Sequence, residues 1–306
     1  MPEARGELTL VVLAAGLGSR FGGDKAFAPV GPGGETLFDY SVFDAARAGF
    51  ERLVLVVPAG TDQALRNAVS RRYRGCLSVD FVEQRLTDLP PGWAPPEART
   101  KPWGTAHAVL LASAEIGGPF AAANADDFYG SESWRRLGGA IRGAKEGEGA
   151  LVAYRLRDTM PERGAVSRAV CQRASSGRLR SLVEVQEIER HGGGFRGVAP
   201  GGPIDLSGDE WISMNLWGFA PGVREGLLLE FERFLGECAA SVTAEYLLPA
   251  AVDALMRGAR LGVSVLEAEG PWLGITRRSD VPQVSARLQD LVASGIYPCP
   301  LFSPGD

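Results

Sequence analysis

The sequence is poor in the residues that most often build metal and redox centres. Its 306 residues include four cysteines and two histidines. No two cysteines have the spacing of a zinc site, and two histidines cannot form a multi-histidine centre. These scarcities exclude both kinds of metal centre, and nothing in the cysteine pattern indicates a disulfide-bonded secreted protein.

Long apolar runs and a strong net charge are also missing. No stretch approaches 18 uninterrupted apolar residues, and the first ten residues, MPEARGELTL, lack the layout of a signal peptide. The formal net charge is −5, so neither nucleic acid nor an anionic membrane is expected as the principal partner. Hydrophobic residues make up 45% of the chain, which is enough for a large core. We therefore expect a cytoplasmic protein.

Apolar runs alternate with helix-period segments through the first half of the chain. This succession predicts an α/β fold with a mainly parallel, Rossmann-like sheet between two layers of helices. The expected strands are 8–14, 52–58, 78–83 and 119–125, and the expected helices are 36–50, 61–73 and 105–116. Five prolines make the loop 87–104 stiff and extended, and seven glycines predict a mobile loop over 191–208.

The pattern changes after residue 150. Short turns between apolar segments indicate a smaller β-rich lobe over 150–218, inserted between a nucleotide-binding half, 1–149, and carboxyl-terminal helices, 219–306, that complete one domain. The expected strands of this part are 150–156, 165–172, 180–189, 210–219 and 262–267, and the expected helices are 223–238, 244–258 and 280–294.

The glycine-rich stretch LAAGLGSRFGGDK, 13–25, follows the first expected strand. A Walker loop requires Ser or Thr after the lysine, but Lys25 is followed by Ala26, and the dinucleotide pattern GxGxxG is broken by one extra residue. A triphosphate clamp fits better. Gly16 and Gly18 would cradle phosphate oxygens with their bare amides, while Arg20 and Lys25 would neutralise the charge that develops in phosphoryl transfer.

This stretch resembles the signature loop of the nucleotidylyltransferases that make nucleoside-diphosphate sugars, LAAG-x-G-[ST]-R-spacer-K. The resemblance implies a GT-A-type fold and catalytic roles for Arg20 and Lys25. The short step between these two residues is closer to the molybdopterin nucleotidylyltransferases, which leaves the acceptor open. The nucleotide-binding residues that the resemblance implies in the loop are Leu13, Ala14, Ala15, Gly16, Gly18 and Ser19.

Two further motifs follow in the order of the family. KPWGTAHA resembles the segment that contacts the nucleobase, through close approach at Gly104 and a hydroxyl of Thr105 that could also cap the next helix. We expect His107 to be packed or hydrogen-bonded. FAAANADDFYG matches the family's metal aspartate at Asp126 and implies Mg²⁺ as cofactor, with Asp127 as a second ligand or as the cap of the next helix.

The second half carries weaker matches to residues that bind the sugar phosphate. These are Gly164 in ERGAVS, Glu184 in SLVEVQE and Asn215 in SMNLWGF. There are two departures from the family. Val185 stands where many members have a lysine for the acceptor phosphate. Gly274 and Thr276 stand where the family has a second metal ligand, so either Asp280 substitutes, or water completes the metal shell, or the activity is altered.

The expected reaction transfers a nucleoside monophosphate from a nucleoside triphosphate to a sugar 1-phosphate, with release of pyrophosphate. Three alternatives stay open: transfer of CMP or GMP to a molybdopterin-type or other phosphorylated acceptor, a silent nucleotide-binding subunit and, least supported, a nicotinamide dehydrogenase. The apolar segment GIYPCPLF, 295–302, could pack on a second copy in a homo-oligomer. The sequence does not identify the base or the sugar.

Overall fold

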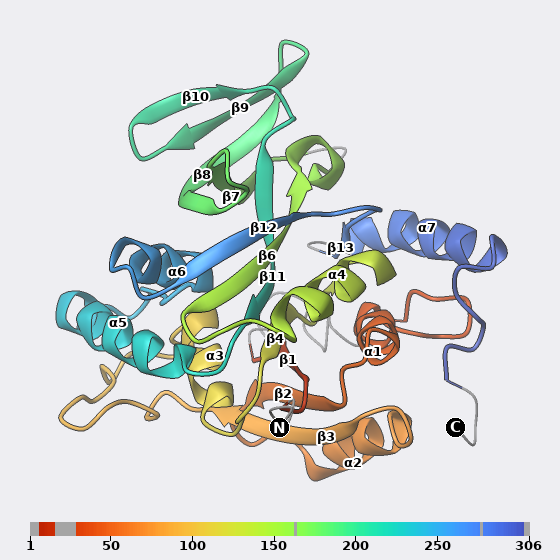
Figure 1. The fold of residues 1–306 in the computed structure, drawn as a ribbon, viewed down its shortest axis with the longest axis horizontal. Helices are drawn as coiled ribbons and strands as arrows, with labels where there is room; N and C mark the ends of the chain where they lie inside the picture. The colour runs from red at the N-terminus through yellow and green to blue at the C-terminus, as the bar shows by residue number, and fades with distance from the viewer. Residues whose placement is uncertain (1–5, 16–28, 162–163, 276–277, 303–306) are drawn as a thin grey trace.

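The computed structural model describes residues 6–15, 29–161, 164–275 and 278–302. The predicted α/β class is confirmed: a mixed central sheet, parallel over its first four long strands, lies between two layers of helices (Figure 1). The strands of the first half are β1 (Thr9–Leu13), β2 (Arg52–Pro58), β3 (Ser78–Gln84), β4 (Phe120–Asn124) and the short β5 (Asp127–Phe128). The helices are α1 (Leu37–Arg47), α2 (Gln63–Arg72), α3 (Thr105–Ser113) and α4 (Ser131–Ile141).

The second half extends the same sheet with mostly antiparallel pairs. Its strands are β6 (Glu148–Arg155), β7 (Val166–Arg173), β8 (Leu179–His191), β9 (Gly194–Ala199), β10 (Gly202–Leu206), β11 (Trp211–Phe219), β12 (Gly262–Glu267) and β13 (Leu273–Gly274). The helices are η2 (Leu156–Thr159), α5 (Val223–Cys238), α6 (Leu248–Arg257), η3 (Arg278–Asp280) and α7 (Val281–Ala293).

The strand order explains how the two halves meet. It runs β10-β9-β8-β7-β11-β4-β1-β2-β3, with β6 on β11 and β12 on β6. Strand β11 is antiparallel to β4, so residues beyond 210 join directly onto the parallel sheet. Figure 1 shows β7 to β10 extending from one end of this sheet. The predicted β-rich lobe is therefore continuous with the nucleotide-binding half through β11.

The core has one layer on each face of the sheet. Alternate residues of β1 point to opposite faces, as the period of a strand requires: Leu10 and Val12 pack with α1 and α4, whereas Val11 and Leu13 pack with α3, α5 and α6. A third cluster joins α1 to α7 and the carboxyl-terminal segment. Tyr297 and Leu301 of the segment 295–302 are buried there within their own chain.

Two parts of the sequence prediction need correction. The loop expected over 191–208 is mostly the hairpin β9–β10, because Phe195 and Leu206 are buried and pair across it. Helix α4 was not predicted. Its apolar face, Trp134, Leu137 and Ile141, is fully buried against the sheet.

Candidate functional site

The carboxyl ends of β1 and β4 lie side by side. Leu13, the last residue of β1, is paired with Asn124, the last residue of β4. The Ala125 amide then donates to the Leu13 carbonyl at 3.4 Å. The glycine-rich stretch and the acidic stretch therefore leave the sheet at the same edge, where α/β folds bind ligands.

Only the start of the glycine-rich stretch belongs to the described residues. Leu13 and Ala14 are buried, and the Ala14 amide donates to the Val56 carbonyl at 2.9 Å. Ala15 is half-buried. The other residues predicted to bind phosphate here lie outside the described residues: Gly16, Gly18, Ser19, Arg20 and Lys25.

Asp127 is held in a buried network beside Asp126. Its Oδ2 atom accepts a hydrogen bond from Asn124 Nδ2 at 2.8 Å and lies 3.2 Å from the Tyr129 hydroxyl. Burial and the neighbouring charge of Asp126 raise the pKa of Asp127 to about 7. Asp127 does not cap α4, whose N-cap is Gly130 without a side-chain hydrogen bond.

These two carboxyl groups fit a magnesium ion. Mg²⁺ takes one or two protein carboxylates and completes its shell with water and phosphate oxygens, so a larger acidic cluster is not required. The repulsion between Asp126 and Asp127 is what a divalent cation would relieve. Among the residues that the structure describes, no group of three or more His, Cys, Asp or Glu side chains could hold a metal.

Strand β13 brings the late part of the chain to this edge. Gly274 is paired with Asp127, and the Ile275 amide donates to the Asp126 carbonyl at 3.3 Å. A Cβ at Gly274 would lie 2.4 Å from the Trp272 ring and 2.8 Å from Asp127 Oδ1. The close approach of β13 therefore leaves no room for a carboxylate at position 274. Asp280 lies farther along the chain, at the start of α7.

A small pocket of about 200 Å³ brings together several predicted site residues. Thr105, Glu184 and Asn215 line it, whereas Gly164 is not among its lining residues. Asn215 has a φ of 61° and sits where the register of β11 against β6 shifts. This bulge lets Asn215 Nδ2 approach Asn124 Oδ1 at 3.5 Å.

The segment around Gly104 differs in part from its prediction. Gly104, not Thr105, is the N-cap of α3, and the Thr105 hydroxyl accepts a hydrogen bond from the Leu248 amide at 2.9 Å. Gly104 has a φ of 108°, and a Cβ there would lie 2.6 Å from the Tyr246 carbonyl oxygen. The close approach predicted at Gly104 is thus made by the protein's own backbone.

The packed role predicted for His107 is confirmed. The ring is buried, and burial lowers its pKa. Its Nε2 lies 2.7 Å from the Asp88 carbonyl oxygen, which can only accept, so Nε2 carries the proton. Nδ1 then accepts from Gln84 Nε2 at 2.9 Å. The neutral His107 ring forms a hydrogen bond with each nitrogen, and the one to Asp88 anchors the loop that precedes α3.

Arg168 is a site residue that the sequence prediction missed. It lies on β7 directly opposite Val185, the position at which the resemblance expects a lysine. Its guanidinium lines the small pocket and interacts electrostatically with Asp127 and Glu184. No local motif marks Arg168, because only the β7–β8 pairing brings it to this edge.

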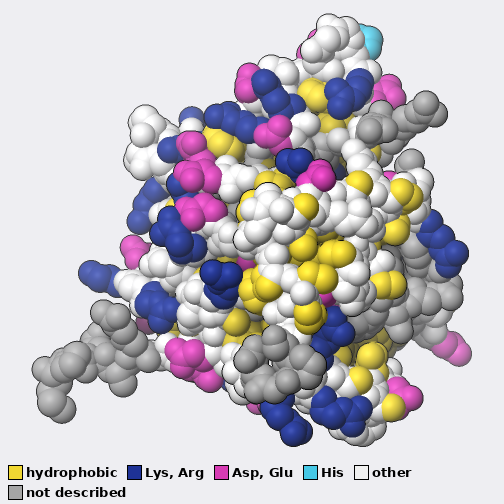
Figure 2. Space-filling view, turned by 90° about the vertical axis from the view of Figure 1, so that its right-hand side faces the viewer, with side chains coloured by type: hydrophobic (Ala, Val, Ile, Leu, Met, Phe, Trp, Pro, Cys, Tyr) yellow, Lys and Arg dark blue, Asp and Glu magenta, His cyan; other side chains and the backbone are white. Residues whose placement is uncertain are grey.

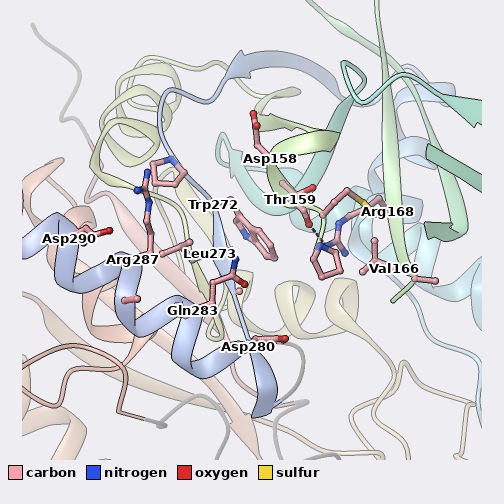
Figure 3. A pocket seen from close by; sticks show the side chains of 17 residues that line it. Asp158, Thr159, Val166, Arg168, Trp272, Leu273, Asp280, Gln283, Arg287 and Asp290 are labelled. Carbon is pink, nitrogen blue, oxygen red and sulfur yellow. Dashed lines mark hydrogen bonds between the residues drawn. The ribbon is translucent and has the colours of Figure 1, made fainter. Parts of the chain in front are cut away.

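A larger pocket of about 470 Å³ adjoins the small one at Arg168. It is walled by residues 158–161 and 165–166, by β13 and by one face of α7, which contributes Gln283 and Arg287. Figure 3 shows Trp272 in the middle of this pocket and Asp280 at one end. Basic, acidic and aromatic side chains thus line one pocket next to the sheet edge that carries Asp126 and Asp127.

The face of the molecule in Figure 2 carries no large area of one charge among its described residues. Basic and acidic side chains are interspersed around a central group of hydrophobic ones. Within the described residues, no helix has the length and apolar character that crossing a membrane requires.

Comparison with known proteins finds one family model that matches the amino-terminal part of the chain. Residues 10–126, from β1 to the acidic edge, match the model of the MobA-like NTP transferase domain. This part of the chain is similar to NTP transferase domains. The predicted resemblance and the predicted enzyme class, a nucleotidyltransferase, are confirmed. No curated protein matches the chain significantly in sequence.

Solved structures share the fold over nearly the whole chain. The inositol-1-phosphate CTP transferase from T. maritima is 16% identical, with a TM-score of 0.60 over 93% of this chain and 97% of its own. The CTP:phosphocholine cytidylyltransferase from Streptococcus pneumoniae is 13% identical, with a TM-score of 0.61 over 92% and 99%. A UDP-glucose pyrophosphorylase complexed with UDP-glucose is 15% identical, with a TM-score of 0.58 over 93% and 99%. At these identities the likeness concerns the fold.

Proposed function

We propose that this nucleotidyltransferase moves a nucleoside monophosphate from a nucleoside triphosphate to a sugar 1-phosphate. The observation that carries the proposal is the register that ends β1 and β4 together, at Leu13 and Asn124. The triphosphate would lie over this edge, with the glycine-rich stretch on one side and Asp126 on the other. The sugar would occupy the small pocket, where Glu184 and Asn215 offer hydrogen bonds to hydroxyl groups.

In the reaction, an oxygen of the acceptor phosphate attacks the α-phosphorus in line with the bond to the β-phosphate. That bond breaks, and pyrophosphate leaves with its electron pair. The second pKa of a phosphate monoester is about 6, so the nucleophile is ionised at neutral pH and needs no protein base. This requirement agrees with a site that offers charges and amides rather than a nucleophilic triad.

The protein's task is then to position two polyanions that repel each other. Two unit charges about 4 Å apart repel by roughly 4 kcal/mol at an effective dielectric constant of 20. Arg20 and Lys25 would hold the triphosphate, and Asp126, with Asp127 beside it, would hold the magnesium ion. Bound there, Mg²⁺ would neutralise phosphate charge. Asn124 and Tyr129 fix the Asp127 carboxylate and so keep this edge in place.

Pyrophosphate release across a matrix of donors and acceptors tests the proposal. The donors are the common nucleoside triphosphates, each with Mg²⁺. The acceptors are glucose 1-phosphate, inositol 1-phosphate, phosphocholine and molybdopterin, because the similar proteins differ in this substrate. One donor with one sugar 1-phosphate should give the highest rate. A preference for molybdopterin would show that the acceptor is not a sugar 1-phosphate. No pyrophosphate release from any pair would indicate a silent nucleotide-binding protein.

A further inference from the structure

The charge of Arg168 is not neutralised by a close carboxylate in the described part of the chain. Its Nη1 donates to the Ser167 carbonyl and its Nη2 to the Thr159 carbonyl, both at 3.0 Å. Within the described residues it has no ion pair with a carboxylate, and its Nε atom is buried without a hydrogen-bond partner. Burying a cation without a counterion is costly, so this arrangement favours an anion nearby.

The surroundings of Arg168 specify where that anion would lie. The residue lines both pockets, which makes it the wall they share. Its guanidinium carbon is 5.5 Å from the centre of the Trp272 ring, and the indole Nε1 is a second buried donor without a partner in the described residues (Figure 3). These two buried donors leave hydrogen-bonding capacity and positive charge unmet at the wall between the pockets, which favours an anion in the adjoining space.

The acidic edge lies within electrostatic reach of the same group. Asp127 and Glu184 raise the pKa of Arg168, whereas burial, the larger effect, lowers it. Glu184 is exposed at the surface, and partial desolvation of its carboxylate raises its own pKa. Within the described residues neither carboxylate forms an ion pair with the guanidinium, although both interact with it electrostatically. Arg168 therefore lies between the predicted metal ligands and the predicted sugar ligand Glu184. The acceptor phosphate, which joins the sugar to the reaction centre, would lie at the same place.

We propose that Arg168 binds the phosphate group of the acceptor, so that a phosphate monoester is required for binding in the small pocket. The proposal rests on the proposed function for the identity of the reaction, but it makes a separate claim about binding. Arg168 approaches the phosphate from β7 and is anchored by Thr159, so its planar fork is oriented before the acceptor arrives.

The test measures equilibrium binding by calorimetry with glucose 1-phosphate, inositol 1-phosphate and phosphocholine as probes. The variants are Arg168→Gln, which removes the charge, and Arg168→Lys, which keeps it. Arg173→Gln is the matched control, because Arg173 lies on the same strand, is exposed, pairs with Glu267 and lines neither pocket. Nucleotide binding and the melting temperature are measured for each protein.

Arg168→Gln should weaken the best-bound probe about 10- to 100-fold, the range for a lost hydrogen bond to a charged group, and leave nucleotide affinity unchanged. Arg168→Lys should retain part of the affinity, and Arg173→Gln should bind like the wild type. If Arg168→Gln does not fold, the affinity of Arg168→Lys decides. It should be at least about threefold lower than that of the wild type, because an ammonium cannot reproduce the bidentate fork of the guanidinium.

Equal probe affinity in the wild type and a folded Arg168→Gln variant would overturn the proposal, as would a wild type that binds none of the probes. Failure of the proposed function is a different result. In that case the wild type binds a phosphate monoester through Arg168 but releases no pyrophosphate with any donor.

Discussion

The buried carboxyl group of Asp44 makes the stability of this fold depend on pH in a direction that can be measured. Asp44 lies on α1 and is 2% exposed. Its Oδ2 accepts a hydrogen bond from the Tyr297 hydroxyl at 2.7 Å, and its Oδ1 has no partner in the described residues. Burial raises the pKa of Asp44 from 3.8 to about 7, against the smaller opposing effects of Tyr297 and Arg47.

The sign follows from linkage. Between pH 3.8 and 7 the folded protein holds this proton more tightly than the unfolded chain, so stability falls as the pH rises through that range. From pH 5 to pH 8 the loss is about 3 kcal/mol, at 1.36 kcal/mol per pKa unit. Asp44→Asn keeps an oxygen for Tyr297 and stays neutral, so it should not suffer this loss.

Urea unfolding of both proteins at pH 5 and pH 8 measures the effect. The variant should gain about 3 kcal/mol on the wild type between the two pH values, because all other titrating groups are shared. Glu97→Gln, at an exposed position, is the control and should follow the wild type. A gain below about 0.5 kcal/mol for Asp44→Asn would refute the reasoning, since it would mean that burial does not hold Asp44 neutral.

Three further predictions concern the residues around the site and its metal. Gly104→Ala should destabilise the fold by more than about 2 kcal/mol in thermal unfolding, because the φ of Gly104 is positive and Tyr246 leaves no space for a Cβ. Gly92→Ala is the control: Gly92 has a similar φ but lies in open space, so this substitution should cost about 1 kcal/mol. Thr105→Val should cost about 1–2 kcal/mol by leaving the Leu248 amide unpaired, and Thr105→Ser should restore it; equal stability of the two would show that this hydrogen bond is not made. Removing divalent metal with a chelator should abolish pyrophosphate release and added Mg²⁺ should restore it; undiminished release would exclude a metal role for Asp126.

Much of the fold could be predicted because its strands are short, apolar and bounded by turn residues. The bounds expected for 52–58, 223–238 and 262–267 are those that the structure shows for β2, α5 and β12. Helix α4 was missed, although Trp134 and Leu137 have helical spacing, because Gly138 and Gly139 weaken the pattern.

The hairpin β9–β10 shows why glycine content misled the prediction. Gly197 is not a flexible link: a Cβ there would lie 2.6 Å from the Val185 side chain and 2.9 Å from the Gln186 carbonyl oxygen. The glycine allows close packing of β9 on β8. Composition alone does not separate this use of glycine from mobility, because the neighbour that requires it is distant in the sequence.

The candidate site was predictable where residues follow a strand end and not where they depend on strand pairing. Asp126 and the start of the glycine-rich stretch were placed at one edge from the order of the parallel strands, and the pairing of Leu13 with Asn124 agrees. Arg168 and the close approach of Gly274 arise from pairs formed across long stretches of chain. The roles of Arg20 and Lys25 stay predictions, since both lie outside the described residues.

The most direct test of the central claim is pyrophosphate release by the wild type, Asp126→Ala and Lys25→Ala with the best donor and acceptor. Both substitutions should lower turnover by at least about 100-fold and leave the melting temperature near that of the wild type. Asp209→Ala and Lys145→Ala, at exposed positions, should retain activity. Undiminished release in either site variant would contradict a reaction carried out where β1 and β4 end together.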